Sequence, residues 1–111
     1  MDLISEQHGD VLVVHAMEPR IDAAGAIQFK DKMRDIVQAP TQRVVLDMSR
    51  VAFLDSSGLG AVVAVMKLLG PDRKLELAAL TPTVEKVFRL TRMDSVFTIH
   101  TRLADGLHSA R

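Results

Sequence analysis

The chain has 111 residues, of which 48 % are apolar and 14 each are acidic and basic, so its net charge is zero. This length can enclose one hydrophobic core, and the apolar fraction excludes a disordered chain. Without a basic excess, the composition does not suggest a nucleic-acid-binding surface and gives no attraction to an anionic membrane. Because the chain has no cysteine, disulfides, thiolate metal sites and cysteine nucleophiles are excluded. We expect a single domain over residues 1–111.

Neither the N-terminal segment nor the longest apolar stretch predicts export or membrane insertion. The N-terminal segment MDLISEQHGD lacks the basic and then apolar regions of a signal peptide. The longest apolar stretch, Gly58 to Met66, is about half of what spans a bilayer. We therefore expect a soluble, cytoplasmic protein.

The first half of the chain predicts strands on either side of a helix. Residues 11–16 are a compact apolar run, typical of a strand, and residues 3–6 are the candidate hairpin partner. Asp22 is placed to cap a helix that stops before Pro40. The apolar residues of this helix recur at helical spacing: Ala26, Phe29, Met33, Ile36 and Val37. The β-branched segment 44–48 predicts the next strand, and residues 49–54 are expected to be a connector.

The second half continues the alternation of helices and strands. Asp55 or Ser56 begins a helix that Gly70-Pro71 ends. The remaining expected elements are a strand at 75–79, a helix beginning at Thr81-Pro82, a strand at 97–100 and a short helix at 102–110.

The resulting order, β-β-α-β-α-β-α-β-α, predicts an α/β domain with a mixed, mostly parallel sheet of four or five strands. A sheet covered on both faces consists of continuous apolar strands. In the last two strands, however, Glu76, Thr98 and His100 alternate with apolar residues. We therefore expect the helices to cover mainly one face of the sheet.

The segment Asp55-Ser56-Ser57-Gly58 permits two interpretations. Aspartate and serine are favoured helix N-caps, and glycine permits a tight turn, so the segment can be a simple helix start. A helix N-terminus also stabilises an anion, so Ser56 could carry a phosphate there. The residues alone leave both interpretations open.

The helix behind this segment has almost no polar face. Lys67 is its one charged residue, and its two apolar faces consist of Leu59, Val62, Val63, Met66 and Leu69, and of Ala61, Val65 and Leu68. A helix that is apolar all round is either buried among other elements or uses one face to bind a partner. A partner on the second face would place Ser56 at the edge of its binding surface.

Three segments resemble the STAS domains of the anti-sigma-factor antagonist family. The most specific is VVLDMSRVAFLDSSGLGAVVAVMKLL, with its D-S-S-G-L-G run after an apolar strand. RIDAAGA is similar to the acidic turn of the family, and TPTVEKVFRLTRMDSVFTIHT is similar to its third helix and last strand. The resemblance covers essentially the whole chain and implies a single STAS domain.

The resemblance implies a partner-switching regulator and not an enzyme. In that family the unphosphorylated domain binds an anti-sigma factor, which is also a serine kinase of the histidine-kinase-like ATPase superfamily. Phosphorylation of the serine after the aspartate, here Ser56, dissociates the complex, and a PPM-type phosphatase reverses it. The implied partner-binding residues are Asp22, Asp55, Ser57, Gly58, Leu59 and Gly60. No cofactor, metal or bound nucleotide is implied, and we expect a monomer.

The chain departs from the family pattern in one place. The family has a glycine shortly before the acidic turn, whereas this chain has Met17-Glu18-Pro19-Arg20-Ile21-Asp22. This difference affects the expected role of Asp22 and the choice of partner more than it affects Ser56.

Other functions fit the sequence less well. No G-x-S-x-G nucleophile elbow or Walker A motif is present, and the four histidines show no triad or metal-site spacing. A response-regulator receiver could use Asp47, but the first strand is followed by no acidic pair to hold Mg²⁺. A non-switching STAS scaffold, as in lipid-transport or stress-sensing complexes, stays open as an alternative.

Overall fold

The computed structural model describes residues 1–108. Its elements are β1 (Leu3–His8), β2 (Val11–Ala16), β3 (Arg20–Ile21), α1 (Ala26–Ile36), β4 (Arg43–Asp47), β5 (Phe53–Leu54), α2 (Ser56–Leu69), β6 (Lys74–Ala78), α3 (Pro82–Leu90), the 3₁₀ helix η1 (Met93–Ser95), β7 (Thr98–His100) and α4 (Leu103–His108). All of the expected helices and strands are present, and the expected end of the last helix at Ala110 lies outside the described residues.

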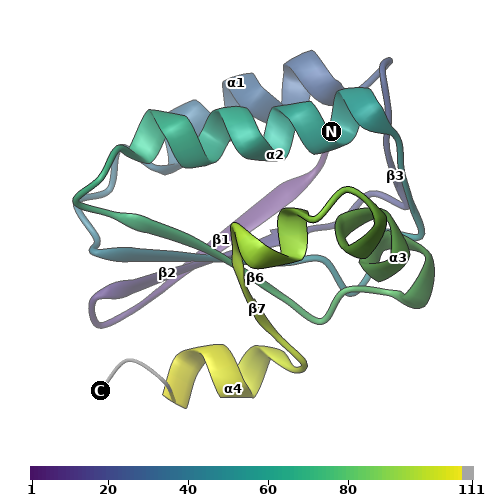
Figure 1. The fold of residues 1–111 in the computed structure, drawn as a ribbon. Coiled ribbons are helices and arrows are strands. Elements are labelled where there is room, and N and C mark those ends of the chain that lie inside the picture. The colour runs from purple at the N-terminus through teal and green to yellow at the C-terminus, as the bar shows by residue number, and fades with distance from the viewer. Residues whose placement is uncertain (109–111) are drawn as a thin grey trace.

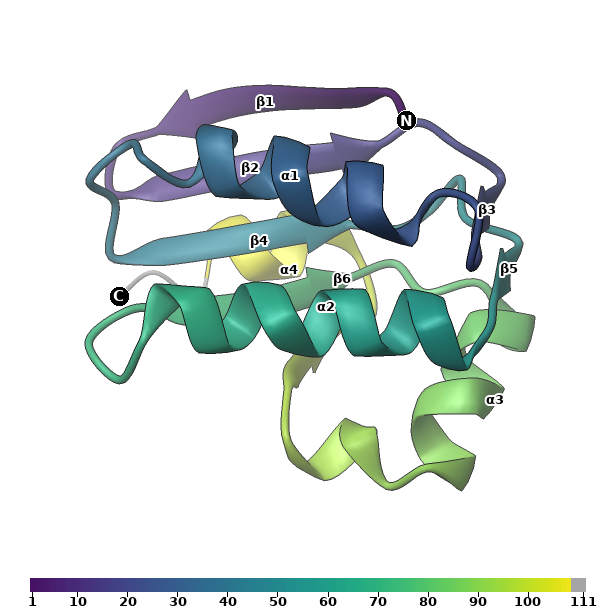
Figure 2. The same ribbon diagram turned by 90° about the horizontal axis from the view of Figure 1, so that it is seen from above.

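The main sheet confirms the predicted α/β architecture. Its five strands lie in the order β1-β2-β4-β6-β7, with β1 antiparallel to β2 and the other neighbours parallel. Helices α1 and α2 lie side by side over one face of this sheet, and α4 lies on the opposite face (Figure 1). Viewed from above, α3 and η1 lie beyond α2, next to the β7 edge (Figure 2).

The main core lies between the sheet and helices α1, α2 and α3. Alternate residues of the central strands point into it because successive side chains of a strand face opposite sides. The strand residues are Leu12, Val14, Val44, Leu46, Leu75 and Leu77, and they pack with helix residues such as Phe29, Met33, Val62, Val65 and Phe88. Phe88 of α3 meets Phe97 edge-on, with ring centroids 5.9 Å apart.

The second face of α2 is mostly core, which corrects one of the two interpretations of this helix. Ala61 and Val65 are each only 2 % exposed, because α2 packs along α1. Leu68, assigned to the same face by sequence, is 49 % exposed. A partner therefore cannot reach most of this face without unfolding the helix pair.

Glu76 lies in the interior. It is only 3 % exposed and lies beneath α4. The alternation of Glu76 with apolar residues predicts that this face of the sheet has little helical cover, but α4 covers it. The Arg43 guanidinium donates to both of its oxygens, at 2.5 and 2.7 Å, and a ring nitrogen of His100 lies 2.7 Å away. The charge is tolerated because the Arg43 guanidinium neutralises it and His100 adds a further polar partner. Around this network, α4 packs on a small second core of Val11, Val13, Val45 and Ala78.

A second, two-stranded sheet was not predicted. β3 and β5 pair in parallel through Arg20 with Phe53 and Ile21 with Leu54. The expectation of a connector at 49–54 is therefore wrong at its end. The Pro19 carbonyl, just before β3, accepts hydrogen bonds from Ala52 and Phe53 at 2.8 and 3.1 Å. This pairing brings the turn that follows β3 next to the start of α2.

Candidate functional site

The N-terminus of α2 is capped by Asp55, one of the two helix starts that the sequence permits. Asp55 Oδ1 accepts a hydrogen bond from the Gly58 amide at 2.9 Å, and the Asp55 carbonyl accepts from Leu59 at 2.9 Å. Ser56 and Ser57 are the first two helical residues, and both are exposed. Their N–H groups lie in the turn that has no intrahelical acceptors. The helix start is therefore electropositive and accessible, which suits a phosphate on a serine.

The glycines of the motif occupy different environments. Gly58 is buried, and a β-carbon on it would lie 2.0 Å from the Ile21 carbonyl oxygen. This glycine lets α2 pack directly against the backbone of β3, so it is not an exposed contact residue. Gly60 is exposed, and a β-carbon there would meet nothing within 4 Å. Leu59 lies between these extremes, half-buried against the main core.

Asp22 does not cap α1, which corrects the sequence-based prediction. Helix α1 begins at Ala26, with Gly25 as its N-cap. Asp22 instead starts the turn before the helix. Its carbonyl accepts from the Gly25 and Ala26 amides at 3.0 and 2.8 Å, and its Oδ1 accepts from the Ala24 amide at 3.1 Å. The turn presents the Asp22 carboxylate at the surface, where its side chain is 27 % exposed.

Arg20 orients the Asp22 carboxylate. Its Nε donates to Asp22 Oδ2 at 3.2 Å, and its guanidinium lies 4.2 Å from the centre of the Phe53 ring. The hydrogen bond from Arg20 is the main reason why the pKa of Asp22 lies below its usual value. Asp22 is therefore a carboxylate at neutral pH, and a partner group that binds it there competes with Arg20.

The unusual segment before Asp22 forms the rim of a shallow hollow. The residues that line this hollow are Met1, Glu18, Pro19, Arg20, Asp22, Ala24 and Gly25. Glu18 lies 3.7 Å from the N-terminal ammonium group. Glu18 and Pro19 thus stand beside the acidic turn, where the family pattern has a glycine. Their side chains form part of the surface next to Asp22, which the sequence alone could not show.

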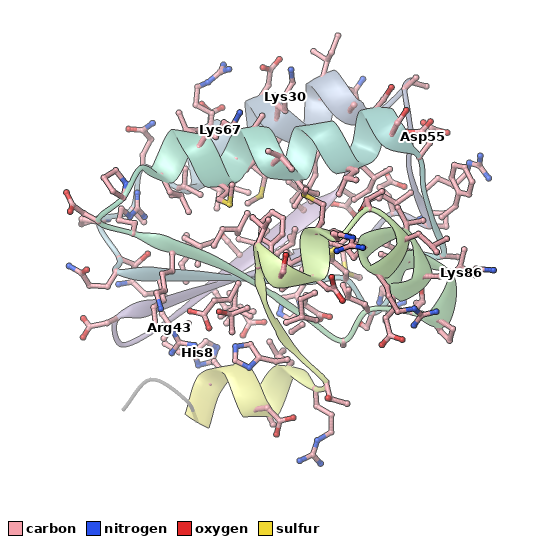
Figure 3. The ribbon with its side chains drawn as sticks, in the orientation of Figure 1. His8, Lys30, Arg43, Asp55, Lys67 and Lys86 are labelled. Carbon is pink, nitrogen blue, oxygen red and sulfur yellow. The ribbon has the colours of Figure 1, made fainter. Side chains whose placement is uncertain are left out.

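Asp55 connects the turn to α2. Its second oxygen, Oδ2, accepts from the Ala23 amide at 3.3 Å. In Figure 3, Asp55 lies at the start of α2 next to the segment that leads into α1. The structure therefore brings the sequence-predicted residues together at one end of the helical layer, with Asp22 on one segment and residues 55–60 on the other.

The histidines that the structure describes in full lie elsewhere. His15 bridges Asp47 and Glu6 at 2.7 and 2.8 Å, and His100 contacts Glu76, all on the face of the sheet opposite to α1 and α2. Burial raises the pKa of Asp47, but hydrogen bonds from Ser49 and His15 outweigh it and leave this pKa lowered. Within residues 1–108, no group of three or more metal-binding side chains is assembled. Sequence inspection missed these networks because they join residues that are distant in the chain.

Comparison with known proteins shows the family. The model of the STAS domain matches residues 2–106. The chain belongs to the STAS domain family. BtrV of Bordetella bronchiseptica is 30 % identical over 91 residues, which cover 81 % of this chain and 78 % of BtrV. RsfB of Mycobacterium tuberculosis, an anti-sigma-F factor antagonist, is 26 % identical over 94 % of this STAS chain and 84 % of its own.

A solved structure agrees with this STAS assignment. The crystal structure of an anti-sigma factor antagonist from Mycobacterium paratuberculosis has a TM-score of 0.88 and 28 % identity. The similarity covers 99 % of this chain and 93 % of that one. The fold described above is thus that of a STAS domain. None of the helices within residues 1–108 is long and apolar enough to cross a bilayer.

Proposed function

We propose that this STAS domain is an anti-sigma-factor antagonist that is controlled by phosphorylation of Ser56. Its unphosphorylated form binds an anti-sigma factor, which is a serine kinase of the histidine-kinase-like ATPase superfamily, and so frees the sigma factor. A PPM-type phosphatase removes the phosphate from Ser56 and restores the form that binds. The chain works in the cytoplasm, as a substrate and binding partner and not as a catalyst.

The exposed Ser56 directly after the capping Asp55 carries this proposal. The hydroxyl is accessible at the first residue of α2, and the partly exposed Asp22 stands on the neighbouring turn. Two mycobacterial anti-sigma factor antagonists, RsfB at 26 % identity and the M. paratuberculosis protein at 28 %, support the same function. Asp22, Ser57, Leu59 and Gly60 are the proposed contact residues, and Gly58 supports them from the interior.

The chemistry of the switch follows from the position of Ser56. The kinase transfers the γ-phosphoryl group of a nucleoside triphosphate to the Ser56 oxygen, which loses its proton, and the nucleoside diphosphate leaves. The phosphate adds roughly −1.5 to −2 charges at neutral pH. The helix N-terminus stabilises these charges while the adjacent Asp55 opposes them, so the fold tolerates the phosphate. The large effect falls on the partner, which meets the added negative charge beside Asp22.

A pull-down from the native cell extract tests the proposal. Wild-type protein, Ser56→Ala and Ser56→Asp serve as baits with ADP present, and mass spectrometry identifies the prey and maps phosphate on the bait. We expect Ser56→Ala to retain an ATPase-type kinase persistently and Ser56→Asp to retain it weakly. Equal retention of a cognate kinase by all three baits would show that Ser56 is not the switch.

A further inference from the structure

The Asp55 carboxylate joins two parts of the site with its two oxygens. Oδ1 accepts from Gly58 in its own helix, and Oδ2 accepts from Ala23, which lies 32 residues earlier in the chain. We infer that Asp55 is a positioning residue, which holds Asp22 in place relative to Ser56. Through Asp55, a phosphate on Ser56 changes the position of the Asp22 turn. This inference rests on the proposed function for its partner, but its structural part can be tested without one.

The Asp22 turn needs such a connection because its own support is short. β3 has two residues and pairs with the two residues of β5. The other hydrogen bonds of Asp22 go to Arg20, Ala24, Gly25 and Ala26, all within four residues of it. Local bonds of this kind shape the turn, while the close packing of Ile21 on Gly58 places its start against α2. The bond from Ala23 to Asp55 adds a direct hydrogen bond between the turn itself and the start of α2.

A phosphate on Ser56 acts on the weaker of the two Asp55 bonds. The phosphate repels the adjacent carboxylate and competes with it for the amides of the helix start. The bond to Gly58 is 2.9 Å long and partly buried, whereas the bond to Ala23 is 3.3 Å long and exposed. The longer, solvated bond is the weaker one, so it breaks first. Asp22 then loses its fixed position at the moment when Ser56 gains its charge.

Asp55→Asn isolates the bond to Ala23. Asparagine caps helices as well as aspartate does, so its oxygen keeps the Gly58 amide. Its NH₂ group then faces the Ala23 N–H and cannot accept from it. We expect the folded state to persist, while hydrogen exchange at the Ala23 amide becomes on the order of tenfold faster. Asp31→Asn, at an exposed position of α1, is the matched control.

Nuclear magnetic resonance on the free protein tests the transmission. Phosphoserine is incorporated at position 56 during synthesis, so no kinase is needed. We expect faster exchange and shifted signals at residues 22–24 in the phosphorylated wild type, as in unphosphorylated Asp55→Asn. In Asp55→Asn, phosphorylation should then change these signals little. Unchanged residues 22–24 in the phosphorylated wild type would overturn the inference, whatever the partner proves to be.

A double-mutant cycle separates positioning from direct contact. Affinity for the captured kinase is measured for wild type, Asp55→Asn, Asp22→Asn and the double variant. If Asp55 acts through Asp22, Asp55→Asn weakens binding about tenfold in the wild type and less than about twofold in Asp22→Asn. Equal losses in both backgrounds would show that Asp55 touches the partner directly. If wild type captures no kinase, the proposed function fails, and the magnetic resonance result still decides the structural part.

Discussion

Gly58 of α2 faces the backbone carbonyl of Ile21 so closely that no side chain fits between them. A β-carbon on Gly58 would lie 2.0 Å from the Ile21 oxygen and 2.9 Å from its carbon, and both of these are backbone atoms. Such a contact can be relieved only if β3 or α2 moves. The glycine of the D-S-S-G motif therefore sets how closely the Asp22 turn lies to Ser56.

Replacing the two motif glycines should have opposite effects on stability. Gly58→Ala should lower the free energy of unfolding by about 3 kcal/mol, because the methyl group forces β3 and α2 apart. Gly60→Ala should raise it by about 0.5–1 kcal/mol, because that position is open and alanine favours a helix. Urea unfolding followed by circular dichroism measures both values. A Gly58→Ala protein as stable as the wild type would contradict the close packing of β3 on α2.

Val65 is buried and Leu68 is half-exposed on the second face of α2, so a charged side chain should be tolerated at position 68 but not at position 65. Val65→Glu should lower the free energy of unfolding by more than about 4 kcal/mol, because it buries a carboxylate between α1 and α2. Leu68→Glu, one turn further along at a half-exposed position, should change it by less than about 0.5 kcal/mol. Thermal unfolding of both variants compares them. A folded, stable Val65→Glu protein would mean that this face is open to a partner.

Stability should fall in acid because of the buried Glu76. Burial raises the pKa of Glu76, but hydrogen bonds from Arg43 and His100 outweigh it and leave the pKa below the ordinary value of 4.5. A carboxyl group whose pKa is lowered by folding stabilises the protein above its unfolded pKa. The free energy of unfolding should therefore decline as the pH falls below 4.5 and through the lowered pKa of the folded state. Urea unfolding at a series of pH values measures this decline.

A neutral substitution identifies the group responsible. Glu76→Gln should cost about 3 kcal/mol at neutral pH, because it removes the carboxylate that neutralises the partly buried Arg43 guanidinium. It should also make the acid decline shallower. Glu85→Gln, in an exposed ion pair of α3, should change neither quantity by more than about 0.5 kcal/mol. The same acid decline in wild type and Glu76→Gln would assign it to other carboxylates, such as Asp47.

The periodic elements of this fold could be predicted from the sequence because each has a strong local signal. The apolar run at Val11–Ala16, the cap at Asp55 and the proline at position 82 all mark the elements that the structure contains. β3 and β5 could not be predicted, because two-residue strands show no period and depend on each other across the chain. The sequence favours Asp22 as a helix cap because aspartate is a common N-cap, whereas Asp22 starts the turn before Gly25, the true cap of α1.

The limits of prediction at the site have a physical cause as well. Ser56, Asp55 and Gly60 could be selected from the motif because they lie close together in sequence. The role of Gly58 could not, because it depends on the approach of Ile21 from another segment. The burial of Glu76 likewise depends on α4 and on Arg43 from a different strand. Composition alone cannot distinguish a paired buried carboxylate from an exposed one.

The central claim, that a phosphate on Ser56 controls partner binding, is tested most directly by titration. Affinity for the captured kinase, with ADP present, is measured for unmodified protein and for protein with phosphoserine at position 56. Phosphoserine at position 57, the next exposed residue of α2, is the control for added charge. We predict a loss of about 100-fold or more for position 56 and a smaller loss for position 57. Equal affinity of the unmodified and Ser56-phosphorylated proteins would contradict the proposed switch.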